Sequence, residues 1–130
     1  MKESKAGESK NIEPTKAELE ILAVIWKHGA STVRFVNEKL NEAREVNYTS
    51  TLKLMQIMAD KGILTRDESQ MKHVYQVAQK EQKTKEFLLD KFIDTLYNGS
   101  AGKLMMQLLG NKKTSKEDIE EIRKILDKLG

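Results

Sequence analysis

A run of hydrogen-bonding side chains between positions 47 and 56 is the feature of this sequence best suited to chemistry. Hydroxyl and amide groups bind phosphate oxygens and base edges, and a lysine within the run adds a positive charge. Asn, Ser and Thr are also ordinary residues at a helix start, so the run fits either a nucleic-acid contact or a helix cap. The candidate contact residues are Asn47, Tyr48, Thr49, Ser50, Thr51, Lys53 and Gln56.

Residue types that catalyse reactions or bind metals do not cluster in the sequence. The chain has no cysteine, and its two histidines, His28 and His73, are far apart without a group of carboxylates beside either. Catalysis needs a nucleophile with a base, a pair of carboxylates or a metal site, and no such constellation is present. We therefore predict that the chain is not an enzyme and holds no metal or other cofactor.

Helix-capping residues and a helix-ending glycine predict two helices after the N-terminal arm. Thr15 and Glu18 have the spacing of a capping box, and apolar residues then recur at helical spacing until Gly29 offers a stop. Ser31 or Thr32 is expected to cap a short second helix. On the apolar face of the first helix, a tryptophan at position 26 is predicted to pack in the core.

A third helix and a hairpin follow. Asn47 is expected to cap a helix over residues 48–61, and a glycine at position 62 ends it. Residues 63–66 and 73–77 are β-branched or aromatic enough for two strands, which the polar stretch 67–72 joins.

Three helices followed by a hairpin form the layout of a winged helix, whose third helix enters a major groove while the hairpin lies along the backbone. Arg66 and Lys72 in the hairpin are candidate backbone contacts. The Lys61 side chain has two possible roles: its charge can complement the dipole at the end of the third helix, or it can contact DNA. The fold class we predict is mainly α with a small β-hairpin, with a winged helix-turn-helix preceding a helical region.

The C-terminal part is predicted to form helices over 80–97, 104–109 and 114–129, the last opened by a capping box from Thr114 to Glu117. Its apolar stripe fits an intramolecular core, a dimer interface or, as we favour, a mixture of both. The candidate dimerisation residues are Phe87, Leu88, Phe92, Leu96, Leu104, Leu108, Ile119, Ile122 and Leu126. The expected organisation is a disordered arm (1–13), a winged helix (14–79) and a dimerisation domain (80–130).

Charge and composition leave several classes of binding protein open. Residues 1–79 carry 12 basic and 11 acidic side chains, and residues 80–130 carry 11 and 9, giving a net charge of +3. Composition alone does not indicate nucleic acid, so a protein-interaction adaptor remains the main alternative, and an activator or nonspecific nucleoid protein another. The charged N-terminus is unlike a signal peptide, and the apolar stretches are too short to span a bilayer. We therefore expect a cytoplasmic location.

Several segments resemble one family. Residues 18–26 resemble the first helix of the penicillinase and methicillin-resistance repressors (the BlaI/MecI family), and residues 48–53 running into 58–64 resemble its recognition helix and Lys-Gly turn. Tyr75 stands where the family has an aromatic residue in its second wing strand, and 117–126 resembles its last helix.

The resemblance implies a homodimer that binds palindromic operators and silences genes. It also implies a membrane metalloprotease receptor as a partner, which releases the DNA by cleaving the dimerisation region. The family's scissile bond is typically Asn-Phe, and Gln107-Leu108 stands at the matching position here, which departs from that pattern. The copper-responsive mode of some relatives requires a cysteine cluster, which this chain lacks.

Overall fold

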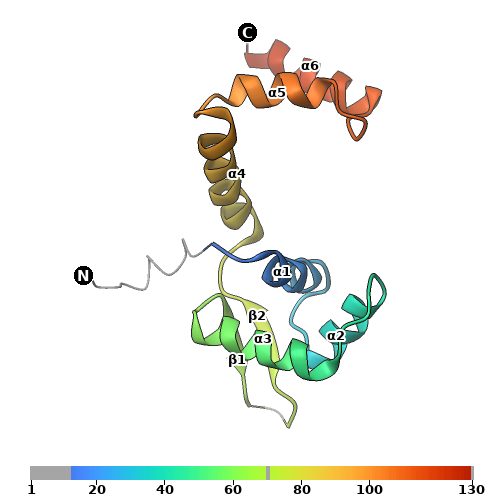
Figure 1. Ribbon diagram of the computed structural model, residues 1–130, viewed down its shortest axis with the longest axis vertical. Coiled ribbons are helices and arrows are strands. Elements are labelled where there is room, and N and C mark those ends of the chain that lie inside the picture. The colour runs from blue at the N-terminus through green and yellow to red at the C-terminus, as the bar shows by residue number, and fades with distance from the viewer. Residues whose placement is uncertain (1–12, 70, 130) are drawn as a thin grey trace, which may run out of the picture. The chain divides into compact units, whose positions relative to one another are not determined.

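The computed structural model describes residues 13–69 and 71–129, which form helices and one antiparallel hairpin (Figure 1). The chain divides into two compact units between Phe87 and Leu88. The predicted fold class, mainly helical with a small hairpin, is confirmed. The predicted N-terminal arm lies outside the described residues, apart from Glu13.

The first unit begins with α1 (Lys16–His28), α2 (Val33–Asn41) and α3 (Tyr48–Asp60). The capping box predicted at α1 is confirmed. The Glu18 backbone N–H donates to Thr15 Oγ1 at 3.2 Å, and the Thr15 N–H donates to Glu18 Oε1 at 2.9 Å. Each side chain thus satisfies a backbone donor that the first helical turn leaves free.

Local caps also begin the other two helices. Of the two residues proposed to cap α2, Thr32 is the cap, because its Oγ1 accepts a bond from the Phe35 N–H at 3.1 Å. Ser31 instead pairs with a strand. Asn47 caps α3 as expected, with its Oδ1 accepting a bond from the Ser50 N–H at 2.9 Å.

The hairpin consists of β1 (Leu64–Asp67) and β2 (Val74–Val77), with Leu64 opposite Val77. Each strand begins one residue later than the sequence pattern suggests. Ile63 is used in the turn that ends α3, where its N–H donates to the Met58 carbonyl at 2.9 Å.

A third segment joins the hairpin at one residue. The Ser31 N–H donates to the Tyr75 carbonyl at 3.0 Å, and the Tyr75 N–H donates to the Ser31 carbonyl at 2.8 Å. These two bonds attach the wing directly to the residue that precedes the cap of α2.

All three helices and both strands contribute to one apolar core. Trp26 is half-buried against it, which confirms the predicted packing, and its buried Nε1 has no hydrogen-bond partner among the described residues. The buried apolar members are Ile21, Leu22, Ile25, Val33, Val36, Met55, Met58, Leu64 and Tyr75.

An ion pair joins the start of α1 to the end of α3. Lys61 Nζ lies 2.8 Å from Glu18 Oε2, and the Glu18 side chain is only 1% exposed. Lys61 therefore has a structural partner that neither of its sequence-based readings included.

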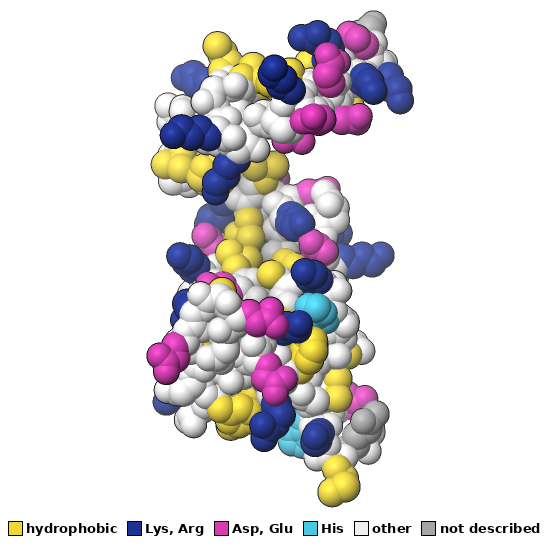
Figure 2. Space-filling view, turned by 90° about the vertical axis from the view of Figure 1, so that its right-hand side faces the viewer, with side chains coloured by type: hydrophobic (Ala, Val, Ile, Leu, Met, Phe, Trp, Pro, Cys, Tyr) yellow, Lys and Arg dark blue, Asp and Glu magenta, His cyan; other side chains and the backbone are white. Residues whose placement is uncertain are grey.

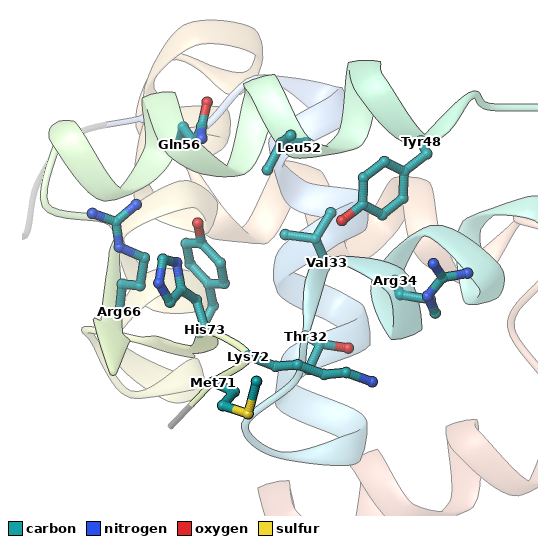
Figure 3. A pocket seen from close by; sticks show the side chains of 11 residues that line it. Thr32, Val33, Arg34, Tyr48, Leu52, Gln56, Arg66, Met71, Lys72 and His73 are labelled. Carbon is teal, nitrogen blue, oxygen red and sulfur yellow. The ribbon is translucent and has the colours of Figure 1, made fainter. Parts of the chain in front are cut away.

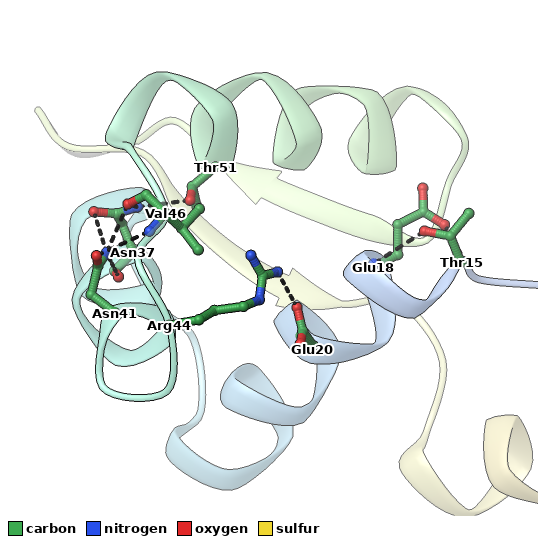
Figure 4. A network of polar contacts seen from close by, with 8 residues as sticks. All are labelled: Thr15, Glu18, Glu20, Asn37, Asn41, Arg44, Val46 and Thr51. Carbon is green, nitrogen blue, oxygen red and sulfur yellow. Dashed lines mark hydrogen bonds and ion pairs between the residues drawn. The ribbon is translucent and has the colours of Figure 1, made fainter.

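A polar network fixes the loop between α2 and α3 (Figure 4). Asn37 Nδ2 donates to the Val46 carbonyl at 3.1 Å and to Thr51 Oγ1 at 2.8 Å. Asn41 Nδ2 donates to the same carbonyl at 2.8 Å, and its Oδ1 accepts from the Val46 N–H at 3.1 Å. The loop thereby sets the position at which α3 begins.

Substituting Asn37 with alanine should destabilise the first unit by about 1–3 kcal/mol, because Thr51 is buried and loses its donor. Chemical denaturation followed by circular dichroism measures this change. Glu38→Ala is the matched control, since Glu38 is exposed on the same helix, and it should stay within about 0.5 kcal/mol of the unsubstituted protein. Equal stability of the two variants would contradict a role for the network.

The remaining helices are α4 (Glu81–Tyr97), which crosses the boundary between the units, α5 (Ala101–Leu109) and α6 (Lys116–Leu129). The capping box predicted for α6 is wrong by one residue. Ser115 Oγ accepts from the Asp118 N–H at 3.0 Å, and Asp118 Oδ2 accepts from the Ser115 N–H at 3.2 Å. None of the described helices combines the length and apolar character needed to cross a bilayer.

Candidate nucleic-acid interface

The polar run at the start of α3 divides between the surface and the interior. Tyr48, Thr49 and Ser50 are exposed, as are the later candidates Lys53 and Gln56. These side chains are free to meet a ligand along the outer side of α3.

Two other members of the run have structural roles. Thr51 is 2% exposed, and its hydroxyl accepts a bond from Asn37. A side chain so buried cannot reach a duplex in this fold, so we leave it out of the contact set. The Oδ1 atom of Asn47 caps α3, and its side chain borders a different hollow, beside Arg44 and Val46.

A pocket of about 310 Å³ lies between α2, α3 and the wing (Figure 3). Three α3 residues spaced by four positions form one wall, because residues at this spacing share a helix face. The start of α2 and the wing form the others. The lining residues are Thr32, Val33, Arg34, Tyr48, Leu52, Gln56, Arg66, Met71, Lys72, His73 and Tyr75.

The pocket is basic. Arg34, Arg66 and Lys72 line it, and none of the lining residues in the described chain carries a carboxylate. The Arg34 guanidinium lies 5.9 Å from the centre of the Tyr48 ring, a cation–π contact that holds both side chains at the rim. Four of the predicted contact residues, from α3 and the wing, thus meet at one site: Tyr48, Gln56, Arg66 and Lys72.

Arg66 already has partners within the wing. A hydrogen bond to the Tyr75 hydroxyl raises the pKa of Arg66, and the Glu68 carboxylate, 2.5 Å away, raises it further. Arg66 therefore stays positively charged, and a phosphate approaching it would compete with Glu68.

Thr32, Arg34 and His73 also line the pocket, although sequence reasoning did not include them among the contacts. For Arg34 the sequence did contain a signal. Arg34 lies two residues after the cap of α2, and in helix-turn-helix proteins the helix that precedes the recognition helix crosses the DNA backbone. For His73, only the folded position of the wing shows the association.

Comparison with known proteins identifies the family. The family model described as penicillinase repressor matches residues 14–128. The chain belongs to the penicillinase repressor family. It is similar to a penicillinase repressor of Bacillus licheniformis, with 27% identity over 85% of this chain and 87% of that protein. It also resembles a penicillinase repressor of Staphylococcus aureus (24% identity; 92% and 94% coverage) and the methicillin resistance regulatory protein MecI of Mammaliicoccus sciuri (24%; 93% and 98%).

Membership of the penicillinase repressor family confirms the resemblance seen in the sequence. The matching model describes repressors, so the expectation that the chain is not an enzyme is confirmed as well. The match runs through both compact units, so the helical C-terminal region is part of the family's common architecture.

The candidate dimerisation residues of this family member are partly exposed helix residues. Phe92, Leu96, Leu108 and Leu126 are 44–62% exposed, whereas Phe87, Leu88, Leu104, Ile119 and Ile122 are half-buried. Leu108, Ile119, Ile122 and Leu126 line a groove of about 460 Å³ between α5 and α6. Gln107 and Leu108, the residues at the position of the family's scissile bond, are both exposed on α5.

Proposed function

We propose that this protein is a sequence-specific DNA-binding repressor that acts as a homodimer on palindromic operators. The observation that carries the proposal is the basic pocket beside the exposed polar side of α3, at the place where a winged helix meets DNA. The names of the relatives, which are repressors and a regulatory protein, support the same function.

Pairing of two chains is supported by the helical unit, whose apolar side chains are poorly covered (Figure 2). No residue between 88 and 129 is fully buried. Of the thirteen exposed large hydrophobic residues in the described chain, ten lie in this unit, including Phe92, Leu96 and Leu126. Exposed apolar surface of this kind marks an interaction site, and a second copy presents the same apolar surface in return.

A fluorescence-anisotropy titration tests the proposal. The probe is a labelled duplex from upstream of the protein's own gene, titrated at two salt concentrations with excess unrelated duplex as competitor. Saturable binding of two subunits per site that survives the competitor supports a specific dimeric repressor. Binding that the competitor removes indicates a nonspecific DNA coat, and no binding at low salt favours the protein-interaction adaptor.

Lys53→Ala should weaken binding to the operator by about 1–3 kcal/mol if the lysine contacts a base edge. The loss should then be smaller on unrelated DNA. Lys27→Ala, which removes an exposed lysine from the end of α1, is the matched control and should leave the affinity within twofold. An equal loss on operator and unrelated DNA would make Lys53 a phosphate contact.

We also propose that cleavage at Gln107-Leu108 by a membrane protease receptor releases the DNA. The bond lies within α5, so cutting it separates part of the apolar surface on α5 from α6. Mass spectrometry of the protein recovered from derepressed cells tests this step. Two fragments that meet at this bond support it, and an intact chain that has left the DNA contradicts it.

A further inference from the structure

The basic pocket lies where one strand of the DNA backbone must pass. If α3 enters the major groove and the wing lies against the adjacent minor groove, a single sugar-phosphate backbone separates the two elements. The pocket between α3 and the wing is therefore on the path of that backbone. This placement rests on the function proposed above.

The charged groups around the pocket are cations, and hydroxyl groups lie among them. Arg34 comes from α2, Arg66 from β1 and Lys72 from the turn of the wing, while the Tyr48 and Tyr75 hydroxyls come from α3 and β2. Figure 3 shows the His73 imidazole beside Arg66, below Gln56 and Leu52 of α3.

The nearby acids of the wing are already bonded. Glu68 pairs with Arg66, and the Asp67 carboxylate accepts a bond from the Ser69 N–H at 2.9 Å. A hydrogen bond with the Ser69 side chain, together with this backbone bond, lowers the pKa of Asp67. Neither acid lines the pocket, so the ligand that its charge favours is an anion.

We propose that the pocket receives a phosphodiester of the DNA backbone and that His73 binds it in the protonated form. An imidazole is the side chain that gains or loses its charge between pH 5 and 8, and a charged donor binds phosphate more strongly than a neutral one. A phosphate placed among the surrounding cations removes the repulsion that a further positive charge would meet. DNA binding is then linked to proton uptake at this site, by at most one proton per subunit.

The sign of the pH effect follows from this linkage. The DNA-bound state holds more protons than the free protein, so affinity rises as pH falls and weakens as pH rises. Between pH 6 and pH 8 we expect the affinity per subunit to fall roughly three- to tenfold. The phosphates of DNA do not titrate in this interval, which leaves the protein as the source of the change.

Anisotropy titrations at pH 6, 7 and 8 and constant ionic strength test the role of His73, with the labelled upstream duplex as the probe. His73→Gln should bind at every pH as the unsubstituted protein does at pH 8. His73→Lys, with a permanent charge, should bind tightly and lose the pH dependence. His28→Gln is the matched control, because His28 is the only other histidine and packs edge-on against Phe35, outside the pocket.

The salt dependence provides a second readout that a purely structural role would not change. Each added phosphate contact steepens the slope of log affinity against log salt by about 0.9. The unsubstituted protein should therefore show a slope steeper by about 0.9 per subunit at pH 6 than at pH 8, and His73→Gln should show no difference. Circular dichroism at each pH confirms that the variants remain folded.

The outcomes separate this inference from the proposed function. Absence of specific binding at any pH would reject the repressor itself. Specific binding with the same pH and salt dependence in His73→Gln would retain the repressor and reject the role of His73. Inorganic phosphate at 10 mM should weaken binding more than chloride at equal ionic strength, because a free phosphate in the pocket competes with the DNA backbone for the same groups. An equal effect of the two salts would overturn the assignment of the pocket to a phosphodiester.

Discussion

Replacing Leu96 with glutamate should separate the proposed homodimer into monomers and weaken its binding to the proposed palindromic operator by at least about a hundredfold. Leu96 is 62% exposed on α4, so the isolated chain loses little packing. In a dimer that covers this surface, the new carboxylate would be buried as an uncompensated charge, at a cost of about 3–5 kcal/mol. A twofold dimer carries the substitution twice, and about 2.8 kcal/mol already corresponds to a hundredfold.

Sedimentation velocity at micromolar concentration measures the association, and anisotropy measures the binding. Thr95→Glu is the control, because it places the same charge on the same helix at an exposed polar neighbour. We expect this control to remain dimeric and to bind the operator. A Leu96→Glu protein that sediments as a dimer would exclude Leu96 from the interface, and a monomer with full operator affinity would reject the dimeric mode of binding.

Replacing Lys61 with methionine should destabilise the protein by about 2–4 kcal/mol at pH 7, because it leaves the Glu18 carboxylate buried without its cation. The opposite change, Glu18→Gln, should cost less. The Lys61 side chain is 39% exposed and can reach water when its partner is gone, whereas that of Glu18 is 1% exposed and cannot. Denaturant unfolding of the two single variants and the double variant measures each cost and the coupling between the residues.

The pH dependence of this ion pair follows from the pKa of Glu18. Burial raises that pKa, but bonds from Lys61 and Thr15 outweigh burial and hold it below its ordinary value of 4.5. A carboxyl whose pKa is lowered on folding stabilises the protein above its unfolded pKa and loses that contribution as pH falls through the folded value. The unsubstituted protein should therefore exceed Glu18→Gln in free energy of unfolding by the full amount near pH 7, and the difference should disappear toward pH 3. An advantage that stays constant down to pH 3 would contradict the assigned pair.

Features encoded by neighbouring residues could be predicted from the sequence. The capping box from Thr15 to Glu18 and the Asn47 cap each depend on residues three positions apart. At α6, Thr114–Glu117 and Ser115–Asp118 both offer that spacing. The structure uses the second, because the Thr114 N–H donates instead to the Asn111 carbonyl in the preceding turn.

Contacts between distant segments could not be predicted in the same way. Glu18 and Lys61 are 43 positions apart, and no local pattern pairs them. The meeting of Arg34 with His73 at one pocket likewise depends on where the wing folds. Thr51 is a different case. It has helical spacing with Met55 and Met58, which are both buried, so the helical period of the sequence could have indicated its burial.

The two hydrogen bonds between Ser31 and Tyr75 restrict how far the wing can move from α3. They join the wing to the residue ahead of α2, and the network around Asn37 ties α2 to the start of α3. The distance between α3 and the hairpin is therefore constrained, and it should adjust little when the protein meets DNA. Operators whose minor groove beside the wing has an unfavourable width should therefore bind less tightly, even where the protein touches no base. Selection of target sites would then depend partly on the mechanical properties of the duplex.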